Sequence, residues 1–520
     1  MLTTVYSMSL YGIEGKIINV EVDISNGLPS WEIVGLPDAS IRESKERVRT
    51  AIKNSGYEMY SKKIVINLAP TSTKKEGAAF DLAIAIGILK NLNVISSNDL
   101  KDYVFIGELC LNGEINGVNG VLSMCIEASK LGIKNMIVPY TNREEAGIIS
   151  GLNIYPVKNL EEVVKFLNKE KKIEKYITKY NTFLESNNID FSDVKGQLFA
   201  KRAMEIVAAG AHNCLMLGSP GTGKTMLAKR LATILPSLSF EESLEITKIY
   251  SVVGGLTEKN SIITERPFRN PHHTISKTAL VGGGRIPKPG EITLAHNGVL
   301  YLDEIAEFDK DILEVLRIPL EEHEVRISRW NSTAIFPSKF IFVASMNPCP
   351  CGFLLDKKQK CVCTESQIQK YKNKLSGPLL DRIDIHVEMS SIEYKELQKN
   401  SLGDNSETIR KKVNKAREIQ KSRYEGFGIL VNSELDEKLI NKYCKLNSSA
   451  NKLLENVYNK YSFSARTMKR VLKVARTIAD LEESENIEVE HLAEAIQYRV
   501  KDNNQKNWGM WWIMKIEKLE

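Results

Sequence analysis

The segment LMLGSPGTGKTMLAKRLA, residues 215–232, constrains this chain more than any other stretch. An apolar run leads into a glycine-rich loop and a helix-forming stretch follows it, which is the strand–loop–helix context of a phosphate-binding loop. Glycines let backbone N–H groups close around phosphate oxygens, and the helix N-terminus adds a favourable dipole. We expect Lys224 to reach the β- and γ-phosphates and the Thr225 hydroxyl to hold Mg²⁺. The residues predicted to bind the nucleotide are Gly218, Ser219, Pro220, Gly221, Thr222, Gly223, Lys224 and Thr225.

A second motif supplies the acidic groups that hydrolysis requires. In NGVLYLDEIAEF, residues 297–308, an apolar run ends in Asp303 and Glu304. At the carboxyl end of a strand, the first acid can ligate Mg²⁺ through water and the second can polarise the attacking water. An ordinary strand-to-helix turn capped by aspartate is the alternative. Because the pair follows the phosphate-binding loop along the chain, the sequence favours the hydrolytic interpretation.

Composition narrows the class of protein without identifying a partner. The chain has 520 residues, which allows roughly three domains at about 150 residues each. Lys plus Arg (71) exceed Asp plus Glu (65) by 6, an excess too slight to argue for nucleic acid unless it is clustered. Neither an apolar run of about 18 residues nor a secretory signal is present, so we expect no membrane contact and no export. The few cysteines indicate a reducing, cytoplasmic compartment.

The hydrophobic pattern predicts an α/β protein of several parts. Strands are expected at 16–24, 63–69 and 134–140, and helices at 41–56 and 80–92. Residues 168–192 turn polar and are expected to join two domains as a solvated basic helix. The expected division is an α+β domain at 1–167, a linker at 168–192, an α/β core at 193–390, a helical part at 391–500 and a tail at 501–520.

A third apolar run, KFIFVASMNP (339–348), ends in Asn347, placed to hydrogen-bond the γ-phosphate or the attacking water. Two arginines follow, Arg382 in GPLLDRIDIH and Arg466 in SARTMKRVLKVARTIADL. Surface arginines on helices are the alternative interpretation of this pair.

Together these motifs resemble the AAA+ ATPases, and among them the magnesium-chelatase-related YifB/ComM family. The resemblance implies ATP and Mg²⁺ as cofactors and a P-loop ATPase core followed by a helical lid. It also implies that Arg382 is the finger reaching a neighbouring subunit's γ-phosphate, and that Arg466, or alternatively Arg470, is the second sensor. A finger acting in trans implies a homo-oligomeric ring, expected to be a hexamer. The family-specific stretches are residues 267–284, 287–304 and 347–352.

The N-terminal part resembles the proteolytic domain of Lon-type proteases over residues 66–85 and 113–139. Those enzymes need a nucleophilic serine and a lysine base. The matching positions here hold Ala79 and Leu122, while Ser123 and Lys130 lie nearby but off those positions. We therefore expect a proteolytically inactive domain that serves binding or ring assembly.

Two close pairs of thiols suit a tetrahedral Zn²⁺ with thiolate ligands. Four protein thiolates leave no open position, so such a zinc is structural. Free thiols in a loop, or a transient disulfide, are the alternative, because the pairs are spaced more tightly than zinc pairs usually are. The candidate ligands are Cys349, Cys351, Cys361 and Cys363.

A basic stretch at 258–288 and a hairpin-like stretch at 320–337 lie within the core. A basic, flexible insertion facing a ring's channel can follow a phosphate backbone without reading bases. A solvated loop packing on the next subunit is the alternative. Arg326, Arg329 and Trp330 of the second stretch are further candidates for lining the channel.

The sequence thus favours an ATP-driven ring motor acting on single-stranded or branched DNA. The family resemblance suggests a helicase or translocase for branch migration in recombination of transforming DNA. The rival interpretations are a chelatase-type ATPase that remodels a partner protein, and a scaffold without catalysis.

Overall fold

The computed structural model describes residues 2–59, 62–71, 75–97, 99–178, 189–257, 260–284, 287–329, 332–356, 359–391, 404–461 and 463–499. Residues 179–188 of the expected linker, Trp330 and the tail at 501–520 lie outside these ranges. The fold is mixed α/β, as predicted. Among the described residues, no helix combines the length and the apolar character needed to cross a bilayer.

The N-terminal body is built on a mixed sheet with the strand order β3-β4-β2-β1-β5-β8-β9. The strands β1 and β2 pair antiparallel, whereas β5, β8 and β9 run parallel to one another. Apolar side chains alternate between the two faces, and helices cover both of them. The expected strands and helices of this part are confirmed within two or three residues. The strands are β1 (Leu2–Tyr11), β2 (Glu14–Ser25), β3 (Ser30–Val34), β4 (Lys63–Ala69), β5 (Tyr103–Phe105), β6 (Glu108–Leu109), β7 (Ile115–Asn116), β8 (Asn135–Pro139) and β9 (Asn153–Val157), and the helices are α1 (Ala39–Asn54), α2 (Asp81–Asn91), α3 (Val121–Lys130), α4 (Arg143–Ala146) and α5 (Leu160–Leu167).

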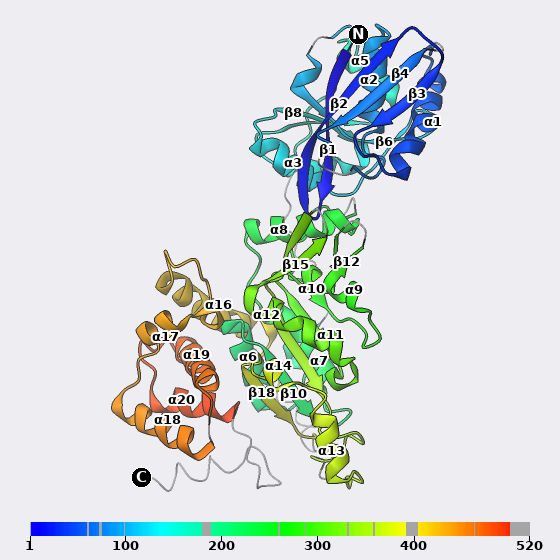
Figure 1. Ribbon diagram of the computed structural model, residues 1–520. Helices are drawn as coiled ribbons and strands as arrows, with labels where there is room; N and C mark the ends of the chain where they lie inside the picture. Colours follow the sequence, from blue (N-terminus) through cyan, green and yellow to red (C-terminus); the bar gives the residue numbers. More distant parts are fainter. Residues whose placement is uncertain are drawn as a thin grey trace.

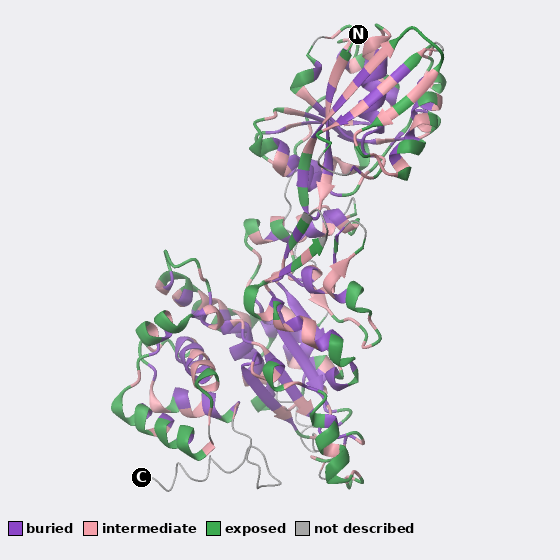
Figure 2. Ribbon diagram, in the orientation of Figure 1, coloured by how far each residue is buried: buried purple, intermediate pink, exposed green. Residues whose placement is uncertain are grey.

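The central body is a parallel sheet with the order β11-β14-β17-β10-β18. Its inner strands are continuous apolar runs because both faces are covered, and Figure 2 shows them as the most buried part of this body. The strands are β10 (Cys214–Gly218), β11 (Phe268–Arg269), β12 (Gly282–Gly283), β13 (Lys288–Pro289), β14 (Val299–Leu302), β15 (Glu324–Arg329), β16 (Ser332–Pro337), β17 (Ile341–Met346) and β18 (Ile385–Met389). The helices are α6 (Leu198–Gly210), α7 (Lys224–Ile234), α8 (Phe240–Val253), α9 (Lys277–Val281), α10 (Glu291–Leu294), α11 (Lys310–Glu314), α12 (Pro319–Glu322), α13 (Glu365–Lys372) and α14 (Gly377–Leu380).

The C-terminal body is helical and packs against one side of the central body (Figure 1). Its apolar residues share one core with α6, α7 and one face of the central sheet. Its helices are α16 (Ser406–Arg423), α17 (Glu437–Tyr443), α18 (Ser448–Tyr461), α19 (Ala465–Leu481) and α20 (Val489–Gln497).

The N-terminal and central bodies meet at the turn between β1 and β2. Ile13 in this turn belongs to the apolar core beneath the β15–β16 hairpin. Polar contacts join the same bodies: the Gly120 N–H donates to the Ser251 carbonyl over 3.0 Å, and Lys248 pairs with Glu14 at 2.8 Å. The predicted hairpin at 320–337 is therefore confirmed, but one of its faces is occupied by the N-terminal body.

The helix expected in the linker is absent from its described residues. Residues 168–178 contain no helix, and the Tyr176 N–H donates to the Ile154 carbonyl over 2.9 Å. The Thr178 N–H donates to the Gly147 carbonyl over 3.1 Å. Backbone partners on β9 and beside α4 thus hold this segment extended against the N-terminal body, a tertiary effect that local charge does not reveal.

Candidate active site

The phosphate-binding loop leaves the carboxyl end of β10 and ends at the first turn of α7. Gly221 and Gly223 adopt left-handed backbone with φ of +78° and +88°, and nothing lies within 4 Å of where a Cβ would stand. A Cβ on Gly218 would lie 2.7 Å from the Met389 carbonyl oxygen of β18. Gly221 and Gly223 therefore permit the left-handed turn and leave the space beside it open. Gly218 permits the loop to pack closely against β18.

Lys224 is buried at the start of α7. Its Nζ donates to the Gly218 carbonyl at 2.7 Å, the Ser219 carbonyl at 3.0 Å and Asn347 Oδ1 at 3.2 Å. Burial lowers the pKa of Lys224, and the carboxylates of Asp303 and Glu304 oppose that change. The residues predicted from the ends of β10 and β17 are thus in direct contact.

Asp303 directly follows β14 and accepts hydrogen bonds from three hydroxyl groups. Thr225 Oγ1 donates to Oδ2 at 2.8 Å, the Tyr301 hydroxyl donates to Oδ1 at 2.9 Å, and the Ser345 hydroxyl also donates to Oδ1. Burial would raise the pKa of Asp303, but these donors hold it below its ordinary value, so the group is ionised at neutral pH. An oxygen of Thr225 and a carboxylate side by side are the donor set that Mg²⁺ prefers.

Glu304 is exposed and has left-handed backbone with φ of +50°. This conformation costs a non-glycine residue about 1 kcal/mol or more, and it is held by an N–H donated to Ser345 Oγ at 3.0 Å. The left-handed backbone at Glu304 ends the extended strand. The ionised Asp303, held by its hydroxyl donors, is therefore followed directly by the exposed carboxylate of Glu304.

The arginines predicted to act in the site differ in their surroundings. Arg382 is 9% exposed, pairs with Glu321 at 2.6 Å and donates to the Arg317 and Pro378 carbonyls. Arg466 is exposed in the first turn of α19, whereas Arg470 pairs with the buried Asp384. Arg470 is therefore engaged with the core, whereas the side chain of Arg466 lies at the surface.

Sequence reasoning missed Ser345, Tyr301 and Gln197. Ser345 and Tyr301 each lie two residues before a predicted site residue on the same strand, so alternation could have placed them on the same face. Gln197 has left-handed backbone, and its Nε2 donates to the Ser390 carbonyl at 2.7 Å and the Thr222 carbonyl at 3.3 Å. No local pattern announces that link between β18 and the phosphate-binding loop.

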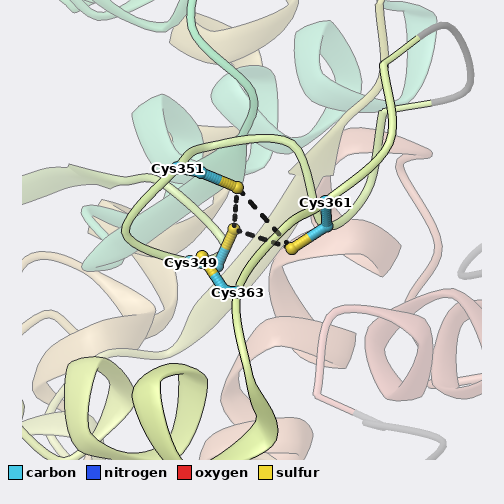
Figure 3. Close-up of side chains that lie close together, drawn as sticks. All are labelled: Cys349, Cys351, Cys361 and Cys363. Atoms are coloured by element: carbon cyan, nitrogen blue, oxygen red, sulfur yellow. Dashed lines mark hydrogen bonds between the residues drawn. The ribbon is translucent and has the colours of Figure 1, made fainter.

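The thiols of the predicted cysteine cluster converge in one loop (Figure 3). Their sulfurs all lie within 4.8 Å of one another, and those of Cys349, Cys351 and Cys361 are 3.4–3.7 Å apart. A tetrahedron with metal–sulfur bonds of about 2.3 Å has edges of about 3.8 Å, whereas a disulfide measures about 2.05 Å. The backbone N–H groups of Phe353 and Val362 lower the pKa of Cys351 to about 6. The four thiols are therefore spaced as the ligands of a tetrahedral metal would be.

The basic stretch at 258–288 is only partly available to a partner. Arg266 pairs with Glu242 at 2.9 Å and Arg269 pairs with Glu291 at 2.7 Å, so both serve the fold. Lys277 and Lys288 are exposed. In the second stretch, Arg326 pairs with Glu322 and Glu324.

Comparison with known proteins places these features in one family. The family models described as magnesium chelatase subunit ChlI, subunit ChlI of Mg-chelatase, and the ChlI C-terminal region match residues 190–397, 20–142 and 403–499. Competence protein ComM of Haemophilus influenzae is 43% identical over 505 residues, covering 96% of this chain and 97% of that protein. This chain belongs to the ComM/YifB family of magnesium-chelatase-like AAA+ ATPases.

A second member of the ComM/YifB family, the uncharacterized protein YifB of Escherichia coli, is 43% identical over 502 residues, covering 96% of this chain and 97% of that protein. The N-terminal body is also related to the Lon protease of Buchnera aphidicola, at 26% identity over 166 residues, covering 29% of this chain and 21% of the protease. Ala79 and Leu122, the residues that we expect to match the protease dyad, are both buried. Ser123 is buried as well, and Lys130 is exposed near Glu127.

Proposed function

We propose that this protein is an ATP-driven ring motor that acts on DNA, as a helicase or translocase that moves branch points during recombination of transforming DNA. The observation that carries the proposal is the meeting of Lys224, Thr225, Asp303 and Asn347 at the carboxyl edge of the central sheet, in a chain that resembles a competence protein over almost its whole length. Because this work is done on DNA and uses reduced thiols, we place the protein in the cytoplasm.

The residues of the site divide the work of hydrolysis among them. The loop N–H groups and Lys224 bind the β- and γ-phosphates, and Thr225 and Asp303 would hold Mg²⁺, which neutralises developing charge when bound. Glu304 accepts a proton from the attacking water, and Asn347 orients that water or the γ-phosphate. Arg466 contacts the nucleotide of its own subunit.

Arg382 supports the proposal of a ring, for which we infer a hexamer. It lies beyond β17 in the segment before β18, near the exposed Ile318 and Glu321, rather than among the residues that contact Lys224. A neighbouring subunit's nucleotide is therefore the target that we assign to it. With Ala79 and Leu122 in place of a nucleophile and its base, the N-terminal body serves assembly and not proteolysis.

A remodelling ATPase of the chelatase type is the second candidate, because the family models that match are those of a magnesium chelatase subunit. In that case the cargo is a partner protein and DNA has no effect on turnover. The two candidate functions share the nucleotide site. They differ only in whether ATP hydrolysis acts on DNA or on a partner protein.

The test is ATP turnover with and without forked or single-stranded DNA. Lys224→Ala should abolish ATP binding, whereas Glu304→Gln should keep binding and stop turnover, because only the water-activating group is lost. Equal loss of nucleotide affinity in the two variants would contradict the role of Glu304. DNA should stimulate the unmodified protein, and a complete lack of DNA binding would favour the chelatase-type function.

A DNA-binding experiment with lysine variants tests where DNA binds. Changing Lys277 and Lys288 to Ala should weaken DNA binding and flatten its dependence on salt, because each lost phosphate contact reduces the salt slope by about 1. Basal ATP turnover should survive, because neither side chain contacts the nucleotide site. Changing Arg326 to Ala provides a control on an arginine already paired with glutamates.

We also propose that the cysteine loop holds a structural Zn²⁺ with thiolate ligands Cys349, Cys351, Cys361 and Cys363. The spacing of the sulfurs supports this assignment, and no exchangeable position is left for chemistry. The expected content is about one zinc per chain, measured by elemental analysis of protein purified without chelators.

A further inference from the structure

The cysteine loop begins where the nucleotide site ends. Strand β17 delivers Asn347, whose Oδ1 accepts a hydrogen bond from Lys224, and only Pro348 separates Asn347 from the buried Cys349. The first thiol pair is therefore joined through a single intervening residue to the side chain that contacts Lys224.

The cysteine loop also contacts the phosphate-binding loop, at Pro220. Gly352 follows the first thiol pair with left-handed backbone, φ +83°, and a Cβ built there would lie 2.7 Å from Cδ and 2.9 Å from Cγ of Pro220. Real Cβ atoms do not approach a ring so closely, and a proline ring on a tight loop has little freedom to move away. Gly352 is thus required both for its turn and for contact with Pro220.

The second thiol pair is tied to the same site. Helix α13 begins directly after Cys363, with Thr364 capping it, and carries the buried Tyr371 near its end. Burial raises the pKa of Tyr371, and the nearby backbone of Asn347 opposes that rise. One turn later, Lys374 pairs at 3.5 Å with Glu307, which lies shortly after Glu304.

The described part of the loop has no helix or strand between β17 and α13. The backbone hydrogen bonds within its described residues form local turns, such as the Gly352 N–H donating to the Cys349 carbonyl over 3.0 Å. Four metal–thiolate bonds would in addition join the segment before Gly352 to the segment before α13. We propose that metal held by these cysteines positions the phosphate-binding loop and Asn347, with Gly352 as the positioning residue through which the loop braces Pro220. This inference rests on the proposed nucleotide and zinc sites, and it makes metal occupancy a condition for efficient ATP hydrolysis.

The first test uses a matched pair of glycine variants in the full-length protein. Gly352→Ala and Gly426→Ala place a side chain on backbone of nearly the same φ, +83° and +82°, but nothing lies within 4 Å of the Cβ position at Gly426. A displacement of about 1 Å in an active site can cost about 100-fold in rate. We expect Gly352→Ala to lower kcat/KM for ATP at least tenfold with zinc content unchanged, and Gly426→Ala to leave it near that of the unmodified protein. Equal kcat/KM values in the two variants would overturn the proposal that Gly352 positions Pro220.

The second test removes the metal and does not depend on catalysis. Zinc is released with a thiol-reactive mercurial and a chelator, the thiols are regenerated, and hydrogen exchange is followed by mass spectrometry before and after zinc is restored. We expect faster exchange in peptides covering residues 215–225 and 341–347, reversed by zinc, and no change in β9 of the N-terminal body. Unchanged exchange around Pro220 would overturn the inference. Zinc-dependent hydrogen exchange in a protein that fails to hydrolyse ATP would instead contradict the proposed function. It would still support the positioning of the phosphate-binding loop by the metal.

Discussion

Glu388 shows how a single residue beside the site can weaken the fold. It lies on β18 opposite Leu217, the residue before Gly218, and its Oε2 is buried without a hydrogen-bond partner among the described residues. Burial raises the pKa of Glu388 from its ordinary value to about 7. Because the folded state binds this proton more tightly than the unfolded state does, the contribution of Glu388 to stability falls as pH rises from about 4.5 to 7.

Glu388→Gln should therefore stabilise the protein at pH 8, where the carboxylate is ionised, and change little at pH 5, where it is already protonated. After allowance for its partial exposure, the expected gain is about 1 kcal/mol in the free energy of unfolding. Thermal unfolding at the two pH values measures the difference. Glu407→Gln on α16, an exposed partner of Lys411, is the control. The same shift in Tm at both pH values would contradict this account.

At the scale of elements, α19 is joined to the central sheet through Asp384, which precedes β18. Asp384 is buried, pairs with Arg470 of α19, and lies 3.2 Å from Nδ1 of His212, whose Nε2 is 2.7 Å from Thr477 Oγ1. Burial alone would raise the pKa of Asp384, but Arg470 and His212 hold it far below its ordinary value. The helix that carries Arg466 is thereby fixed to the segment that carries Arg382.

Asp384→Asn should lower the free energy of unfolding by about 3 kcal/mol, because it leaves Arg470 without its buried partner. A carboxylate with a depressed pKa contributes its stability above the unfolded pKa of about 4 and loses it as pH falls further. The variant should therefore differ most from the unmodified protein at neutral pH and least in acid. Urea unfolding at pH 7, pH 4 and pH 2 measures these differences: the loss at pH 4 should be close to that at pH 7, because both lie far above the folded pKa of Asp384, and it should shrink only at lower pH. A loss that has already vanished at pH 4 would refute the ionised pair.

Strands and helices that show a local hydrophobic pattern could be predicted from the sequence. The ion-pair and hydrogen-bond partners that come from distant parts of the chain could not. The apolar runs of β10, β14 and β17 end in Gly218, Asp303 and Asn347, and parallel strands bring such ends to one edge of a sheet. Arg266 and Arg269 form a basic cluster in the sequence, but Glu242 and Glu291, which neutralise them, come from α8 and α10. The extended course of 168–178 has the same cause, because its hydrogen-bond partners lie in the N-terminal body.

At the scale of the whole molecule, α3 and α4 of the N-terminal body contact α8 of the central body close to Leu122. The Leu122 N–H donates to Glu145 at 3.3 Å, and Glu145 accepts a hydrogen bond of 2.6 Å from Ser251 of α8. Burial raises the pKa of Glu145, while Ser251 and Asn142 oppose the change. Glu145 thus links α3 of the N-terminal body to α8 of the central body through buried hydrogen bonds.

The ring itself is tested through Arg382. In the isolated chain its guanidinium is satisfied by Glu321 and two carbonyls, and a neighbour's nucleotide would replace Glu321 as its anionic partner. An arginine finger commonly contributes about 10³–10⁵ in rate by neutralising charge that develops on the γ-phosphate. Arg382→Ala should therefore bind ATP normally yet hydrolyse it at least a hundredfold more slowly.

Mixing separates a finger that acts on a neighbour from one that acts within its own chain. Arg382→Ala protein has an intact phosphate-binding loop, and Lys224→Ala protein has an intact finger, so mixed rings contain some complete sites at subunit boundaries. Partial recovery of ATP turnover on mixing two inactive preparations is expected, with the largest recovery near equal proportions. Arg317→Ala, which removes an arginine paired within its own chain to Glu314, is the control and should retain turnover by itself. If mixtures stay as inactive as their components while size-exclusion chromatography shows that they co-assemble, Arg382 acts only within its own subunit and the trans site is refuted.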